Sequence, residues 1–156
     1  MIVYRIAAGG STYRPEDTSG RGAAANPGRW NLPDERVVYA ADSIALAMLE
    51  TGAHLGLAVP MNRYVIEIEI PDSVWERRKI FPEASLPGGW DAIPNSIVSQ
   101  QFGSDWYQAG AEAVCELPSV LVREESIFLI NAVHPDAADI KATTGRLVDY
   151  RTLFRM

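Results

Sequence analysis

The chain has 156 residues, 47% of them hydrophobic and 22% charged, which fits one globular domain with a buried core over residues 1–156. Its formal net charge of −6 argues against direct nucleic-acid binding, which needs clustered positive charge. No segment approaches the roughly 20 apolar residues that span a bilayer, so we expect no membrane association.

The amino terminus, MIVYRIAAGG, is apolar but has no basic region, long apolar core or cleavage site typical of a signal peptide. It therefore predicts a first strand and a cytoplasmic protein. The single cysteine, Cys115, cannot form an intrachain disulfide, which agrees with a reducing compartment. Its neighbours in AVCEL predict a buried, inert thiol.

Strands are expected at residues 2–7, 37–41, 63–70, 113–122 with a proline break, and 126–131. The clearest is RYVIEIEI, in which apolar and charged residues alternate as in a half-exposed strand. One helix is expected after Asp42 or Ser43, either of which can cap it, through IALAMLETGAHL.

A second helix is expected from Pro94 to about Gly110, with Ile97, Val98, Phe102 and Trp106 as its apolar positions. The loops at 9–27 and 81–93 are long and rich in glycine and proline, and SGRGAAANPG is predicted to be a mobile loop over a cleft. The order of elements is not a regular βαβ alternation. It indicates an α+β fold with a mixed or mainly antiparallel sheet.

Glu50 lies on the first helix among apolar neighbours, where a carboxylate loses hydration unless a partner or ligand compensates. It can lie at the solvent boundary, or pair with His54 one turn later. Upstream, the proline and glycine of NPGRW fix a turn that aims Arg29, whose guanidinium suits a phosphate or a carboxylate. Taken alone, Arg29 would be an ordinary surface arginine and Tyr39 an ordinary core tyrosine.

The run GRWN, VVYAADSIALAMLE and a following histidine resembles the signature of the RES-domain family, the toxins of bacterial RES/Xre toxin–antitoxin pairs. The residues associated with activity in that family fall on Arg29, Tyr39 and Glu50. The resemblance extends over nearly the whole chain through VYRI with Arg5, ELPSVLVREES with Ser119, and FLINAVHPD with Asn131.

The resemblance implies an ADP-ribosyltransferase-like fold, a split mixed sheet with flanking helices and a cleft for NAD+, the substrate. It implies a toxin that breaks the nicotinamide–ribose bond, with water or phosphate as acceptor, and so depletes NAD+ and arrests growth. Two alternatives stay open: transfer of ADP-ribose to a cellular protein, and a catalytically silent nucleotide-binding module. The implied partner is an Xre-like helix-turn-helix antitoxin that covers the cleft and itself contacts DNA. A homodimer within the complex is also allowed.

Glu50 is the candidate that stabilises the oxocarbenium-like charge on the ribose. Arg29 and Arg5 are predicted to hold the diphosphate, Tyr39 to offer its ring to nicotinamide or its hydroxyl to the cleft, and Ser119 to give a short hydrogen bond. Without the resemblance, Ser119 would be a plain strand serine. Asn131 and His54 complete the substrate-binding set, with His54 favoured as a structural histidine over a base. Two histidines and one cysteine give no zinc spacing, so no metal is expected.

Overall fold

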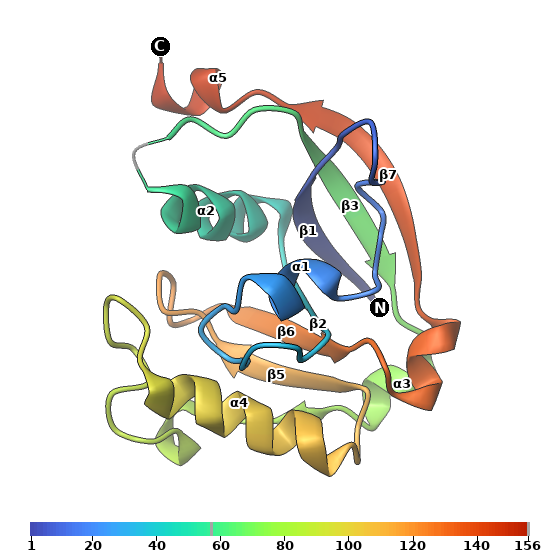
Figure 1. The fold of residues 1–156 in the computed structure, drawn as a ribbon, viewed down its shortest axis with the longest axis vertical. Helices are drawn as coiled ribbons and strands as arrows, with labels where there is room; N and C mark the ends of the chain where they lie inside the picture. The colour runs from blue at the N-terminus through green and yellow to red at the C-terminus, as the bar shows by residue number, and fades with distance from the viewer. Residues whose placement is uncertain (57, 156) are drawn as a thin grey trace.

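The computed structural model describes residues 1–56 and 58–155, and Figure 1 shows their fold. The strands are β1 (Ile2–Ala8), β2 (Val37–Ala41), β3 (Arg63–Glu69), β4 (Lys79–Ile80), β5 (Val114–Pro118), β6 (Ser126–Asn131) and β7 (Lys141–Val148). The helices are α1 (Arg21–Ala25), α2 (Ile44–Leu55), α3 (Asp72–Glu76), α4 (Ile97–Ala109) and α5 (Tyr150–Phe154), with short 3₁₀ turns η1 (Glu83–Ser85) and η2 (Pro135–Asp139).

All seven strands belong to one sheet in the order β4-β5-β6-β2-β1-β3-β7. Only β4 and β5 run parallel; the other neighbours are antiparallel. At the centre, β1 and β2 pair at a single position, Tyr4 with Ala41, whereas β1 pairs with β3 along its whole length. The sheet is therefore split, and the predicted α+β fold with a mixed, mainly antiparallel sheet is confirmed.

The two sheet faces bury separate cores. One core contains Trp30, Leu46, Leu129 and Tyr150, to which α2 and α4 contribute Leu46 and Trp106. The other is rich in isoleucine and valine from β1, β3 and β6 and includes Val74 of α3. Figure 1 shows α1 between α2 and α4, in front of the split region. Cys115 is buried in the first core, and this burial raises the pKa of its thiol, as expected for an inert cysteine.

Helix α4 differs from its expected form. It begins at Ile97 after Ser96, and Ile97 and Val98 are exposed rather than buried. Its buried side is made mainly of small residues, with Ser99, Gly103 and Ser104 joined by Trp106. The reason is close packing: a Cβ on Gly103 would lie 1.8 Å from the carbonyl oxygen of Trp30. Only a glycine lets α4 approach the turn that carries Arg29.

Several elements were not expected from the sequence: α1, α3, α5, β4 and β7. The prediction of a mobile loop for SGRGAAANPG is wrong over Arg21–Ala25, which form α1. The strand expected at 113–122 ends at Pro118, because Ser119 begins a turn. Strand β7 has few buried residues and no clear alternation, so its pairing with β3 defines it.

Within the described chain, no helix is both long enough and apolar enough to cross a bilayer.

Candidate active site

Glu50 is placed by α2, which starts immediately after β2. Ser43 caps the helix by accepting a hydrogen bond from the amide of Leu46 at 3.0 Å. Two turns later, the half-buried Glu50 turns toward the loop after β5, where Ser119 donates its hydroxyl to Glu50 Oε1 at 2.7 Å. The partner of Glu50 is therefore Ser119 and not His54, whose pairing with Glu50 was one of the two alternatives from the sequence. His54 is exposed in the last turn of α2.

Ser119 is fully buried, and its hydroxyl has a defined direction. Its Oγ accepts hydrogen bonds from the amides of Leu121 at 3.0 Å and Val122 at 3.1 Å. Because both lone pairs of the oxygen are used, its proton can only go to Glu50. Ser119 thus fixes one carboxylate oxygen, while Glu50 Oε2 receives no hydrogen bond from the residues that the structure describes.

Arg29 lies opposite Glu50 on the turn before β2. One nitrogen, Nη1, donates to the carbonyl oxygens of Trp90 at 2.9 Å and Ala92 at 2.8 Å. Burial lowers the pKa of Arg29, and the nearby carboxylate of Glu50 opposes that shift. The guanidinium is thus anchored at one end, and its remaining N–H groups are left for an anionic group.

Tyr39 supports the turn that carries Arg29. Its hydroxyl donates to Asn31 Oδ1 at 2.7 Å and accepts from the amide of Trp30 at 3.0 Å. A Cβ on Gly28 would lie 2.8 Å from this hydroxyl, so the turn packs directly on the ring. Burial raises the pKa of Tyr39. The hydroxyl is thus engaged with the Arg29 turn rather than open to a cleft.

Asn31, which sequence reasoning missed, holds the same turn from inside. It is fully buried and uses its whole side-chain amide. Its Oδ1 accepts from Gly28 and Tyr39, and its Nδ2 donates to the carbonyls of Ala23 and Leu32. The available signal was an asparagine directly after GRW, since such residues often stabilise turns through their side chains.

Arg123 is a second residue that the sequence analysis missed. It pairs with Glu83 and Asp91, and its guanidinium lies 5.3 Å from the centre of the Trp90 ring. Arg123 therefore ties the loop after Ser119 to the segment whose carbonyls Arg29 holds. Arginine 123 and its two partners are about 30 to 40 residues apart in sequence, so no local motif reveals the cluster.

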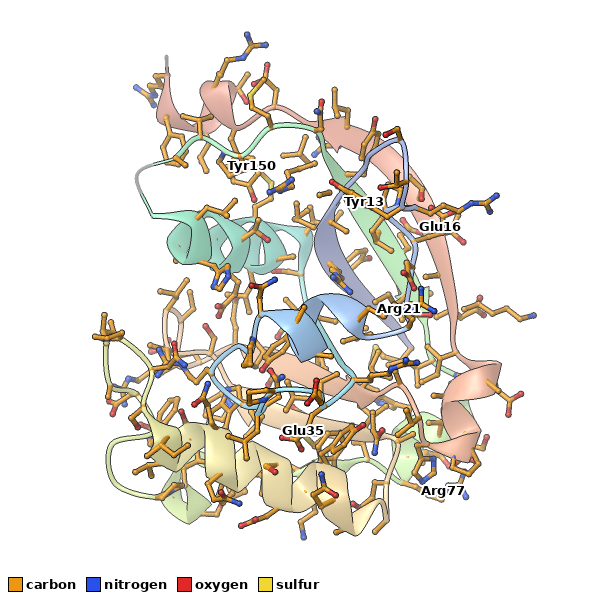
Figure 2. The ribbon with its side chains drawn as sticks, viewed as in Figure 1. Tyr13, Glu16, Arg21, Glu35, Arg77 and Tyr150 are labelled. Carbon is orange, nitrogen blue, oxygen red and sulfur yellow. The ribbon has the colours of Figure 1, made fainter. Side chains whose placement is uncertain are left out.

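Arg5 lies apart from this group, in a cavity of about 680 Å³ between β1, α1 and the loop at 9–20. Burial lowers the pKa of Arg5, and Asp17 opposes the shift. Arg14 and Arg21 also line the cavity. Figure 2 labels three residues of the lining: Tyr13 and Glu16 on the loop after β1, and Arg21 at the start of α1. The cavity is thus rich in arginine but includes two carboxylates.

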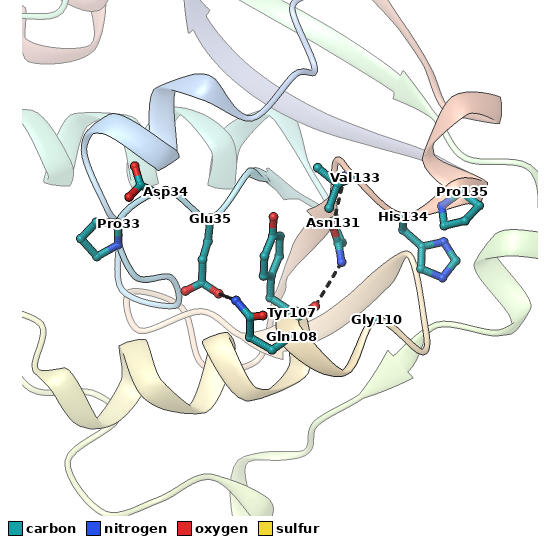
Figure 3. A pocket seen from close by; sticks show the side chains of 10 residues that line it. All are labelled: Pro33, Asp34, Glu35, Tyr107, Gln108, Gly110, Asn131, Val133, His134 and Pro135. Carbon is teal, nitrogen blue, oxygen red and sulfur yellow. Dashed lines mark hydrogen bonds between the residues drawn. The ribbon is translucent and has the colours of Figure 1, made fainter.

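Asn131 lines a different cavity of about 540 Å³, and Figure 3 shows its lining side chains, Glu35 and Tyr107 among them. Its side chain donates to the carbonyl of Tyr107 at 3.4 Å and accepts from the amide of Val133 at 3.1 Å. Asn131 ends β6, whereas Ser126 at the other end pairs with Pro118 beside Ser119. The structure therefore does not bring Asn131 to Glu50.

In the described part of the chain, no three histidine, cysteine, aspartate or glutamate side chains are arranged to hold a metal ion.

The sequence matches the RES domain over residues 2–153. The chain belongs to the RES-domain family. Within it, this RES domain is 49% identical over 144 residues to a Sphingobium protein named "Prs ADP-ribosylating toxin", covering 92% of this chain and 89% of that one. It is 32% identical over 147 residues to "Toxin Res" of Pseudomonas putida, covering 90% and 91%.

A solved structure has the same fold as this RES domain. The Mycobacterium tuberculosis MbcT–MbcA toxin–antitoxin complex includes a chain that matches with a TM-score of 0.67 at 16% identity. The match covers 99% of this chain and 86% of that one. At this identity the likeness concerns the fold alone.

Proposed function

We propose that this RES domain is the toxin of a toxin–antitoxin pair, and that it cleaves NAD+ at the nicotinamide–ribose bond and transfers ADP-ribose to a protein. The observation that carries the proposal is the Glu50 carboxylate, fixed by Ser119 and faced by Arg29. Family membership and the 49% identical ADP-ribosylating toxin support it.

Glu50 suits the electrostatic demand of this reaction. As the C–N bond breaks, its electron pair goes to the nicotinamide nitrogen, and positive charge develops on the ribose. A carboxylate beside the ribose stabilises that charge more in the transition state than in the ground state. Since Ser119 occupies Oε1, we assign Oε2 to the ribose hydroxyls. The acceptor then attacks the anomeric carbon and loses its proton.

The arginines suit the diphosphate of NAD+. Arg29 is anchored through Nη1, which leaves Nε and Nη2 for phosphate oxygens. Arg5 lines a separate cavity beside the split between β1 and β2, and would contact the second phosphate of the same diphosphate. Because the chain is acidic overall, these local cations and not long-range attraction must bind the substrate.

The choice of acceptor for ADP-ribose depends mainly on the named relatives. Water or phosphate was the first expectation from the sequence, whereas the relative named for ADP-ribosylating Prs favours a protein. We therefore propose Prs as the first acceptor to test. The cognate antitoxin, proposed to be of the Xre type, would cover this site in the cytoplasm, by analogy with the family and the toxin–antitoxin complex of like fold.

Product analysis tests the proposal. Purified protein is incubated with NAD+ labelled in the adenylate half, alone, with phosphate, and with purified Prs, beside a Glu50→Gln control. Nicotinamide release with label on Prs is expected. Label only in free ADP-ribose or its phosphate would redirect the proposal to water or phosphate. Intact NAD+ in every arm would refute it and leave the silent nucleotide-binding module.

A further inference from the structure

Three apolar side chains point into solvent beside the candidate active site. Ile93 is 82% exposed, Ile97 62% and Val98 40%. We call these three residues the apolar rim. Single exposed apolar residues are ordinary, but these three lie on one short segment, residues 93–98, beside the candidate site. Ile97 and Val98 were expected as apolar positions of the helix, whereas α4 buries mainly its small residues.

The rim is held against the turn that carries Arg29. Arg29 binds the carbonyl of Ala92, the residue before Ile93. On the other side of the rim, Gln100 Nε2 donates to the carbonyl of Gly28 at 3.1 Å, and Asn95 does so at 3.5 Å. Arg123 fixes Asp91 to the loop that follows Ser119. The exposed isoleucines therefore belong to an anchored segment at the edge of the site.

The surroundings of the rim carry negative charge. From Ile80 to Val122 the sequence has no lysine or arginine but five carboxylates, which are those of Glu83, Asp91, Asp105, Glu112 and Glu116. Arg123 and Arg78 neutralise three of them. Asp105 is exposed on α4, eight positions after Ile97, and so lies on the same helix face. The surface thus offers an apolar contact at the site and a negative charge two turns away.

We propose that the apolar rim docks the protein that accepts ADP-ribose. The occupant is an acceptor segment that places an apolar side chain on Ile93 and Ile97 and a lysine or arginine near Asp105. This inference rests on the proposed function. An acceptor must reach the anomeric carbon beside Glu50, and a dock adjoining Arg29 sets its approach. Water needs no dock, so the rim separates protein transfer from NAD+ hydrolysis.

The test uses the full chain with Ile93→Asp, Ile97→Asp and Asp105→Lys, and Met61→Asp as the control. Met61 is 58% exposed before β3, so its change matches the isoleucine variants in chemistry and exposure. Two rates are measured: labelling of purified Prs with ADP-ribose, and nicotinamide release without an acceptor. Both isoleucine variants should label Prs about tenfold more slowly or worse, since loss of an interface anchor has effects of this order. Asp105→Lys should lower the rate of Prs labelling several-fold. All variants should release nicotinamide as the parent does.

Each other outcome overturns a defined claim. Unchanged labelling by both isoleucine variants, or a parallel fall of labelling and nicotinamide release, would refute docking at the rim. Unchanged labelling by Asp105→Lys would refute the basic part of the occupant. Escape of the isoleucine variants from the antitoxin, with labelling intact, would reassign the rim to the antitoxin. Nicotinamide release without labelling by the parent would refute this inference but leave NAD+ cleavage standing, whereas no release at all would refute the proposed function.

Discussion

Ser119 and Glu50 are 69 positions apart in sequence, and their side chains meet at 2.7 Å through a hydroxyl that has only one direction in which to donate. The serine directly follows β5 and the glutamate lies on α2, so the contact joins two elements at the candidate site. A carboxylate held in this way needs no rearrangement when positive charge develops beside it.

Glu50→Gln should abolish most of the activity while preserving the fold. The amide oxygen of glutamine can still accept the Ser119 proton, but the negative charge at the ribose is lost. By analogy with other electrostatic groups, we expect nicotinamide release to fall by about 10²–10³. Circular dichroism melting should show little change. Parent-like release by a folded variant would contradict the assignment of Glu50.

Ser119→Ala should lower both stability and turnover. It removes the proton that orients Glu50 and leaves the amides of Leu121 and Val122 without a partner, at a cost of about 1–3 kcal/mol. The matched control is Ser126→Ala, which deletes a serine–glutamate hydrogen bond to Glu116 outside the site. The free energy of unfolding in denaturant and the kcat for nicotinamide release are measured for both variants. Equal loss of kcat in the two would show that the Ser119 contact is not special.

Arg29→Lys should raise KM for NAD+ more than it lowers kcat. Lysine keeps the charge but cannot hold two carbonyls and still present a planar fork to phosphate. We expect KM to rise by about tenfold, a difference of roughly 1.4 kcal/mol in binding. Steady-state kinetics with nicotinamide detection measures it. The matched change is Arg151→Lys on α5, which should alter neither constant, because Arg151 pairs locally with Asp149.

Tyr39→Phe should change how stability depends on pH. Burial raises the pKa of Tyr39 above its ordinary value of 10.0, so the unfolded chain loses this proton first as pH rises. The resulting stability is fully present below pH 10 and is lost progressively above it, toward the raised pKa. The free energy of unfolding, measured with denaturant between pH 9 and pH 11, should therefore fall less steeply with pH in the variant than in the parent. An identical slope would contradict burial of the Tyr39 hydroxyl.

Gly103→Ala and Gly52→Ala should act in opposite directions. In an isolated helix either change stabilises by about 1 kcal/mol. A Cβ at Gly52 meets Tyr150 at an ordinary 3.6 Å, so this variant should gain stability. A Cβ at Gly103 would meet the Trp30 carbonyl at 1.8 Å, so α4 must shift away, and we expect a loss of more than about 2 kcal/mol. Thermal melts of both proteins give the comparison, and a stabilised Gly103→Ala would refute the contact.

Sequence patterns were sufficient to predict the elements whose apolar residues recur with a clear period. The alternation in β3 and the capped apolar run of α2 each appear in the structure close to their expected bounds. Strand β7 could not be found in this way, because few of its side chains are buried and its strand form depends on hydrogen bonds to β3. Likewise, α1 is a five-residue helix in a glycine-rich segment, too short for a periodic signal.

For the candidate site, the sequence pointed to residues but not to the contacts that they make. Family resemblance pointed to Arg29, Glu50 and Ser119, and the structure gathers them. The resemblance did not show that the Tyr39 hydroxyl is hydrogen-bonded within the turn that carries Arg29. Nor did it show the contacts of Asn31 and Arg123, because these residues meet their partners only in the folded chain. Asn131, predicted in the same set, lies at the far end of β6.

The single pairing of Tyr4 with Ala41 has a consequence for how the chain folds. One half of the sheet contains β4, β5, β6 and β2, and the other contains β1, β3 and β7, so the chain passes between halves after β1, β2, β3 and β6. Neither half is formed by one continuous stretch of sequence, so neither can fold before the chain of the other half is present. We expect the halves to acquire hydrogen-exchange protection together, despite the weak seam between them, because the connections and not the seam enforce their cooperativity.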